Sequence, residues 1–338
     1  MIFSMAFDPG HLDIRAFVNR EKQMFQLKGI IGALLQIEGI GLRKRYCICG
    51  ERGVGKSMLM QKVISELKQE EPDTALYAVV DCSIDKSARR ALEKCCEKLA
   101  ELIKEHFPRN KEMCAEAEYL AEIAYRNEIT WGTVKSRTGG VNVSGGFGVF
   151  GFLEAKIGLG AQRGEQISET TKVEVDLRFL RHLIQNTAQS LKDKHQLQIV
   201  FVLDNLDQLE KPGEIEQLVQ ELFVIQEVVY ILTVRNESIS SDIRRNTTQF
   251  MLNGFEERAL IELVTKRLET LHPEMIPEFE KYAIHEVSEK LALLTDNPFS
   301  YLKWLHHLYL NLEMADSIEL LKEGFQGFFG NRVRLLPL

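Results

Sequence analysis

Gly50-Glu-Arg-Gly-Val-Gly-Lys-Ser57 has the residue pattern of a phosphate-binding loop. An apolar run, Tyr46-Cys-Ile-Cys49, precedes it, and an amphipathic pattern follows it, so the context is strand, loop and helix. The glycines at 50, 53 and 55 allow tight turns in which backbone N–H groups can close around phosphates at the positive end of the following helix. The stretch therefore predicts that the chain binds a nucleoside triphosphate.

Individual residues of this loop are predicted to contact different parts of the ligand. Lys56 is placed to reach the β and γ phosphates of ATP, and Ser57 to hold Mg²⁺. The whole predicted nucleotide-binding set of the loop is Gly50, Glu51, Arg52, Gly53, Val54, Gly55, Lys56, Ser57 and Met58.

Composition limits the class of protein. A chain of 338 residues with 45% apolar content can bury one large core or two smaller ones. It has no run of 18 uncharged apolar residues, and its start lacks the features of a signal peptide, so we expect a cytoplasmic protein without a transmembrane segment. The six cysteines lack paired metal-ligand spacing and are expected to be reduced core residues. The net charge of −7 argues against a dominant nucleic-acid surface, although local basic clusters leave contact with nucleic acid open.

Strands and helices alternate along the chain. Apolar runs predict strands at 75–80, 198–203 and 228–234, and periodic patterns predict helices at 24–35, 56–69, 87–106, 112–126 and 173–194. Apolar residues also recur on one face of 255–271, at Leu260, Leu263, Val264 and Leu268, and further helices are predicted at about 280–294 and 299–314. This alternation predicts an α/β fold with a parallel sheet covered by helices on both faces, and ligand chemistry at the carboxyl ends of the strands.

Acidic and amide residues follow the second of these strands. Asp204 ends the strand, where a carboxylate can hold the Mg²⁺ shell directly or through water; its alternative role is an ordinary helix cap. Asn205 can orient a water molecule but cannot take its proton. Asp207 is the alternative acid, and hydrolysis could accordingly be slow or dependent on a partner.

Four stretches together resemble the AAA+ and STAND group of P-loop ATPases, over residues 15–315. They are Phe17-Val-Asn-Arg-Glu21, the loop at 50–57, Leu203-Asp-Asn-Leu-Asp207 and Ile231-Leu-Thr-Val-Arg235. The chain is similar both to origin-recognition-type ATPases and to STAND signalling ATPases. The resemblance implies a three-layer P-loop sheet of the AAA+ type with a small helical lid, and it puts Arg235 at the sensor-1 position, in contact with the γ-phosphate. A surface arginine is the alternative.

The resemblance also implies two further sites. Arg244 or Arg245 is placed like an arginine finger that completes a neighbour's site, with a solvated turn as the alternative. Pro298, within Thr295-Asp-Asn-Pro-Phe299, is placed where related lids approach the nucleotide, although a proline that opens a helix needs no function. Asp296 replaces the usual glycine, and Phe299 stands where several relatives carry a sensor-2 arginine.

The domain organisation follows from these assignments. We expect an N-terminal extension at 1–15, an ATPase domain at 16–254, a helical lid at 255–315 and a tail at 316–338. The number of residues between Lys56 and Asp204 in the sequence exceeds what a compact sheet core needs, which predicts an insertion at about 107–172. Its glycine-rich part, 137–160, predicts a hairpin that contacts a partner, another copy of the chain or a membrane surface. A disordered or locally packed loop is the alternative.

The expected function is an ATP-driven switch that forms a homo-oligomer or engages a separate effector protein. The resemblance adds bacterial defence as a setting. A DNA-associated loader or initiator, or a transposition-type regulator, is one alternative. A nucleotide-binding scaffold with little turnover is the other, because Asn205 stands where many relatives carry glutamate.

Overall fold

A computed structural model describes residues 20–36, 44–83, 87–130, 172–209, 212–271, 291–293 and 295–313. The chain divides into two units, and each is described by itself. The first unit comprises Met1–Leu27, Gly50–Val63 and Met251–Leu338, and the second comprises Lys28–Cys49 and Ile64–Phe250.

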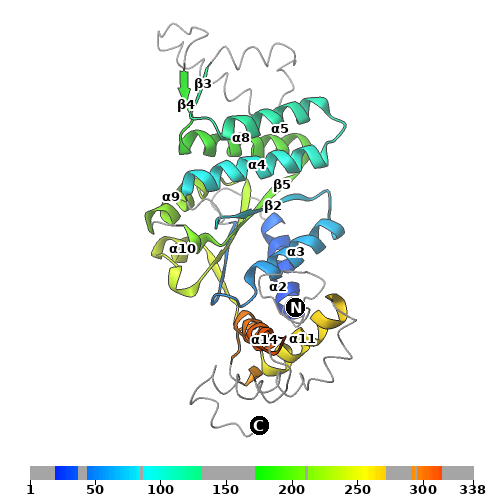
Figure 1. The fold of residues 1–338 in the computed structure, drawn as a ribbon. Helices are drawn as coiled ribbons and strands as arrows, with labels where there is room; N and C mark the ends of the chain where they lie inside the picture. Colours follow the sequence, from blue (N-terminus) through cyan, green and yellow to red (C-terminus); the bar gives the residue numbers. More distant parts are fainter. Residues whose placement is uncertain are drawn as a thin grey trace. The chain divides into compact units, whose positions relative to one another are not determined.

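A five-stranded sheet forms the centre of the fold (Figure 1). Its strands lie in the order β2 (Ala75–Asp81), β5 (Gln198–Asp204), β6 (Val228–Val234), β1 (Arg45–Cys49) and β7 (Thr248–Met251). The β2–β5, β5–β6 and β6–β1 pairs are parallel. The three strands predicted from apolar runs are confirmed, as is the parallel sheet.

Both faces of the sheet are buried, which explains why the strands are apolar without a polar alternation. In β1, Cys47 and Cys49 join the core under one helical layer, while Tyr46 and Ile48 are also buried. All seven residues of β6 are buried. Such continuous burial is the property of a parallel sheet with helices on each side.

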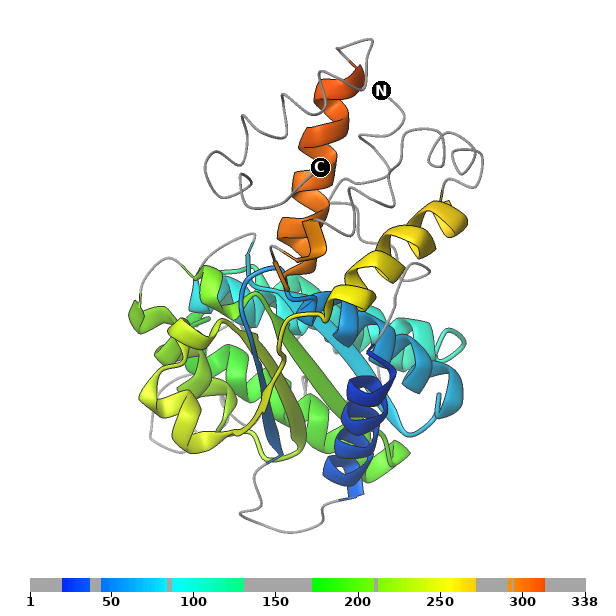
Figure 2. The ribbon, with the colours of Figure 1, turned by 90° about the horizontal axis from the view of Figure 1, so that it is seen from below.

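One face is covered by α4 (Ala88–His106), α8 (Leu177–His195) and α9 (Pro212–Leu222), and α5 (Lys111–Ala124) packs on α4 (Figures 1 and 2). Ser87, Asn110 and Asp176 cap α4, α5 and α8 with side-chain oxygens. On the opposite face lie the second-unit parts of α2 (Glu21–Gln36) and α3 (Lys56–Glu70).

These last two segments are joined by an ion-pair cluster on one lysine. Lys28 Nζ lies 3.2 Å from a Glu66 oxygen and 2.5 Å from a Glu70 oxygen. Helices thus cover both faces of the sheet, which confirms the three-layer arrangement predicted from the alternating pattern.

A short antiparallel pair, β3 (Glu128–Thr130) and β4 (Lys172–Glu174), brackets the glycine-rich segment in the sequence. The hairpin predicted at 137–160 lies outside the described residues. The described part of the proposed insertion contains α5 with these two short strands, and the helix expected at 112–126 is present as α5.

In the first unit, α11 (Glu257–Leu271) packs against α14 (Pro298–Glu313). The apolar face predicted for α11 is buried at Leu260, Leu263, Val264 and Leu268. The helix predicted at 299–314 is α14, and most of the one predicted at 280–294 lies outside the described residues. The domain boundaries at 15, 254 and 315 stay predictions.

The cysteines occupy the interior as predicted. Five of the six are buried, Cys114 is partly exposed, and all six are free thiols. None of the helices in the described part of the chain has the length and apolar character that crossing a bilayer requires.

Candidate nucleotide-binding site

The phosphate loop leaves β1 at Gly50 and enters α3 at Lys56. Gly53 and Gly55 have φ angles of +82° and +93°, in the left-handed region that residues with a Cβ rarely adopt. A Cβ on Gly50 would lie 2.6 Å from the carbonyl oxygen of Leu252, which leaves no space for a side chain there. The tight turns predicted at Gly53 and Gly55 are confirmed.

Lys56 folds its ammonium group back over the loop. Its Nζ donates to the carbonyl oxygens of Gly50, at 2.9 Å, and Glu51, at 2.8 Å. Ser57 follows as the second residue of α3 and is partly exposed. The two residues predicted to contact phosphates and Mg²⁺ thus stand in the first turn of the helix, where N–H groups are not used within the helix.

Arg20 reaches the same loop from the start of α2. The residue is only 4% exposed, and its Nη2 donates to the carbonyl oxygens of Val54, at 3.2 Å, and Asn253, at 2.6 Å. The guanidinium carbon lies 4.2 Å from the centre of the Phe255 ring. Burial lowers the pKa of Arg20 to about 10, so the side chain is still charged at neutral pH.

The Nε of Arg20 is buried and has no hydrogen-bond partner among the described residues. A buried charged donor without a partner is costly. Arg20 also lines a cavity of about 240 Å³. The cavity is lined by Arg20, Glu21, Lys22, Gln23, Gly254, Phe255, Glu256 and Ala259. Arg20 therefore connects a polar cavity to the phosphate loop within the first unit.

The first turn of α14 also contacts the loop. Asn297 Nδ2 donates to the carbonyl oxygen of Arg52 at 2.6 Å, and the Phe299 N–H donates to that of Gly53 at 3.3 Å. Pro298 is buried as the first residue of α14, which confirms that it opens the helix. The contacts with the loop come from its two neighbours, and a nucleotide-binding role for Pro298 stays a prediction.

Asp296 packs against the wall of the cavity. Its carbonyl oxygen accepts the Phe255 N–H at 2.6 Å, and a Cβ on Gly254 would lie 2.2 Å from its Oδ2. A side chain at 296 in place of the usual glycine thus requires a glycine at 254.

The second unit holds the acids at the strand ends. Asp204 is 6% exposed and ends β5. Its Oδ1 accepts the hydroxyl of Thr233, which is fully buried on β6, and the N–H of Asn205 at 3.0 Å. The carboxylate is thereby held in one orientation at the carboxyl end of the sheet.

Asn205 links Asp204 to an acid that the sequence analysis did not select. It has a φ of +54°, and its Nδ2 donates to Asp81 Oδ1 at 3.0 Å. Asp81 ends β2 and stands in register with Asp204. Burial by itself raises the pKa of the Asp81 carboxyl, but hydrogen bonds from Asn205 and Ser83 and the charge of Lys94 outweigh burial and lower it.

The same signal that identified Asp204, an acid at the end of an apolar strand, was present at Asp81. Arg20 had a signal as well, since it lies in the Phe17–Glu21 stretch, but nothing local shows that it contacts Val54 or Asn253. For both Asp81 and Arg20, a hydrogen bond that holds the side chain is made with a residue distant in the sequence.

Two predicted catalytic residues neutralise each other. Arg235 Nε lies 2.7 Å from Asp207 Oδ2, and the Asp207 side chain is 5% exposed. Thr233 is near the end of β6, and Arg235 directly follows the strand. The carboxyl end of β6 therefore supplies partners for both Asp204 and Asp207. The contact of Arg235 with a γ-phosphate stays a prediction.

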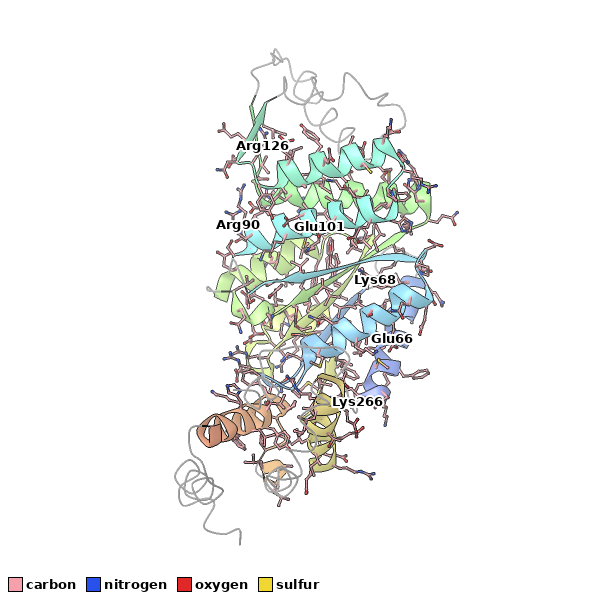
Figure 3. All side chains as sticks on the ribbon, turned by 45° about the vertical axis from the view of Figure 1, so that its right-hand side comes forward. Glu66, Lys68, Arg90, Glu101, Arg126 and Lys266 are labelled. Carbon is pink, nitrogen blue, oxygen red and sulfur yellow. The ribbon has the colours of Figure 1, made fainter. Side chains whose placement is uncertain are left out.

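Arg244 and Arg245 lie in the last turn of α10 (Ser241–Asn246) and are exposed. Arg89 and Arg90 form another basic cluster, and both pair with Glu93, whose side chain is 2% exposed. Figure 3 labels Arg90 on α4. Both arginines are therefore held by one buried carboxylate.

A strand of a parallel sheet that runs through a glycine-rich loop into a helix defines the class of P-loop NTPases. Residues 46–291 match the model of the KAP family P-loop domain, and the chain belongs to this family. No curated protein was found to match the chain.

Solved structures of similar fold are known. The structure of Drosophila ORC bound to DNA has a TM-score of 0.56 at 11% identity, covering 98% of this chain and 66% of that one. The crystal structure of Cdc6p from Pyrobaculum aerophilum has a TM-score of 0.52 at 11% identity, covering 93% and 67%. The chain thus spans about two thirds of the length of these proteins, and the likeness is one of fold.

Proposed function

We propose that the chain is an ATP-binding switch with slow turnover. The observation that carries the proposal is the junction within the first unit, where Arg20 bonds to Val54 of the phosphate loop and lines the cavity beside Phe255. A loop for phosphates and a cavity for the nucleoside are joined by one side chain.

The residues fit such a ligand. Loop N–H groups and Lys56 hold the phosphates, and the nucleoside occupies the cavity that Arg20 lines. Ser57 is the loop residue that would hold Mg²⁺, which supplies charge neutralisation on the phosphates when bound. A place for Asp204 in the Mg²⁺ shell stays a prediction. The remaining loop residues position the backbone around the ligand.

Slow turnover is supported by the strand-end residues. Asn205 cannot take a proton from water, and the charge of Asp207 is paired with Arg235. Asn205 is instead held by Asp81, so its role is to orient water. Completion of the site by a neighbouring copy, through the exposed Arg244 or Arg245, would raise the rate.

The switch acts by assembly in this proposal. ATP favours a form that binds further copies of the chain or a separate effector protein, because a ligand can shift an equilibrium only by binding one form more tightly. A role in bacterial defence rests on the likeness to STAND proteins.

Nucleotide binding is tested first with Lys56→Ala, and Lys68→Ala is the matched control because Lys68 is an exposed lysine on the same helix. Titration calorimetry with ATP should detect binding for the unchanged chain and for Lys68→Ala, and at least a tenfold loss for Lys56→Ala. Equal affinities for all three would disprove the assigned phosphate site.

Assembly is tested by sizing the protein with ATP, with ADP and without nucleotide. Arg244→Ala/Arg245→Ala should leave ATP affinity unchanged and remove ATP-dependent growth in size and phosphate release. Arg178→Ala, at an exposed arginine of α8, is the control. One size under all three conditions would refute assembly.

A DNA-associated loader is the second candidate, because one of the similar structures is that of Drosophila ORC bound to DNA. Binding to duplex DNA that weakens steeply with salt would favour this candidate, since phosphate contacts release counterions. Assembly without DNA binding would favour the switch.

A further inference from the structure

One side chain at the start of α14 makes two kinds of contact. Asn297 Oδ1 accepts the N–H groups of Phe299, at 3.1 Å, and Ser300, at 3.2 Å, and so caps the helix. Its Nδ2 donates to the carbonyl oxygen of Arg52 at 2.6 Å. The cap of α14 is therefore bonded to the phosphate loop.

A second contact lies beside the first. The Phe299 N–H donates to the Gly53 carbonyl oxygen at 3.3 Å. A Cβ on Gly53 would lie 2.3 Å from Phe299 Cβ and 2.8 Å from Asn297 Oδ1. Glycine at 53 is thus required twice, by its φ of +82° and by the closeness of α14.

Peptide planarity carries these contacts to the ligand side of the loop. The Arg52 carbonyl and the Gly53 N–H belong to one rigid trans unit and point in opposite directions, as do the Gly53 carbonyl and the Val54 N–H. Holding the two carbonyls therefore orients the two N–H groups, which are the groups that a phosphate loop offers to its ligand.

The same turn reaches the cavity. Asp296 accepts the Phe255 N–H with its carbonyl oxygen and touches Gly254 with its carboxylate. Residues 296–299 thus contact both the loop and the cavity wall.

We propose that Asn297 is a positioning residue that couples nucleotide binding at the phosphate loop to the start of α14. This inference rests on the proposed function. Asn297 would connect α14 to the bound nucleotide in a chain that has Phe299 where relatives carry a sensor-2 arginine. Coupling between two sites is reciprocal. If the Asn297 contacts increase the affinity for nucleotide, bound nucleotide must stabilise the start of α14 by the same free energy.

The residue type matters for this task. Serine caps a helix as well as asparagine does, but it is too short to reach the Arg52 carbonyl. Aspartate also caps, yet an ionised carboxylate has no proton to donate to that oxygen. Asparagine alone among these three serves both contacts.

The test compares Asn297→Ser with Asn110→Ser, the same change at the N-cap of α5, where Asn110 Oδ1 accepts the Met113 N–H. ATP and ADP affinities are measured by calorimetry, and amide exchange of residues 50–57 and 297–303 is measured with and without ATP. Asn297→Asp serves as a second variant if the serine variant does not fold.

Asn297→Ser should weaken both nucleotides about two- to tenfold, the range of one neutral hydrogen bond. It should also speed exchange at Phe299 without ATP and reduce the protection that ATP gives to α14, while Asn110→Ser should bind as the unchanged chain does. Unchanged affinity, or weaker affinity without a change in exchange, would overturn the coupling and leave the proposed function standing. If the unchanged chain binds no ATP, the proposed function and the coupling fail together.

Discussion

Thr233 illustrates how single residues build the strand-end cluster. Its fully buried hydroxyl donates to Asp204 Oδ1 and accepts the Asn205 N–H at 3.1 Å. It therefore holds both the proposed Mg²⁺-shell acid and the residue that follows it. A side chain that makes two buried hydrogen bonds affects stability and site geometry together.

Thr233→Val keeps the shape of the side chain and removes the hydroxyl. We expect the free energy of unfolding to fall by about 1–3 kcal/mol, because Asp204 and the Asn205 N–H lose a buried partner. Urea denaturation measures the change. Thr233→Ser restores the hydroxyl and should recover most of the loss; equal loss in both variants would point to packing instead.

The carboxyl of Asp81 makes stability depend on pH. Its folded-state pKa is lowered, so deprotonated Asp81 stabilises the fold above the ordinary pKa of 3.8, and this contribution is lost as pH falls through the lowered value. Asp81→Asn should therefore flatten the acid side of the stability curve. Denaturation at a series of pH values checks this, and an unchanged acid limb would contradict it.

At the scale of elements, the helices over the sheet begin and end at residues with identifiable tasks. In α8, Asp176 Oδ1 accepts the Phe179 N–H at 2.7 Å at the start. At the end, Gln196 takes a φ of +56° and donates its N–H to the carbonyls of Leu191 and Lys192. A left-handed residue at this position is usually glycine.

Gln196→Gly should therefore stabilise the protein by about 0.5–1 kcal/mol, because relief of the left-handed conformation exceeds the chain entropy that glycine adds. Thermal or urea unfolding measures this gain. Gln189→Gly, an exposed position inside the same helix, should instead cost about 1 kcal/mol. Destabilisation by both changes would contradict the assigned C-cap.

At the scale of the whole molecule, the residues proposed for nucleotide binding fall in two units. The phosphate loop, Arg20 and α14 belong to the first, and Asp81, Asp204 and Arg235 belong to the second. Each unit organises its own cluster through hydrogen bonds.

ATP should stabilise the unit that holds the phosphate loop. At a concentration a hundredfold above Kd the gain is about 2.7 kcal/mol. Thermal unfolding with increasing ATP measures it, and Lys56→Ala should show no gain. Hydrogen exchange should place the first protection in the loop at 50–57 and at 297–303. Protection confined to the second unit would contradict the site.

Local patterns carried much of the prediction. The glycine spacing at 50–57, the apolar runs of β2, β5 and β6 and the periodicity of α11 each depend on residues close together in the chain, so the sequence predicted these elements and the parallel sheet. Asp296 shows the limit. The sequence showed an aspartate where relatives carry glycine, but only the structure shows that Gly254 leaves space for its side chain.

The sequence by itself determined that this chain has a phosphate-binding loop on an α/β sheet, because turn conformation, helix periodicity and strand burial are properties of neighbouring residues. Only the tertiary structure decided that Arg20 joins a cavity to that loop, that Asp207 is paired with Arg235, and that Asn297 bonds to Arg52. The Arg20 and Asn297 bonds span 34 and 245 residues, and the Asp207–Arg235 pair joins one strand end to the next. Which side chains meet at such separations depends on how the elements pack, and no local pattern carries that information.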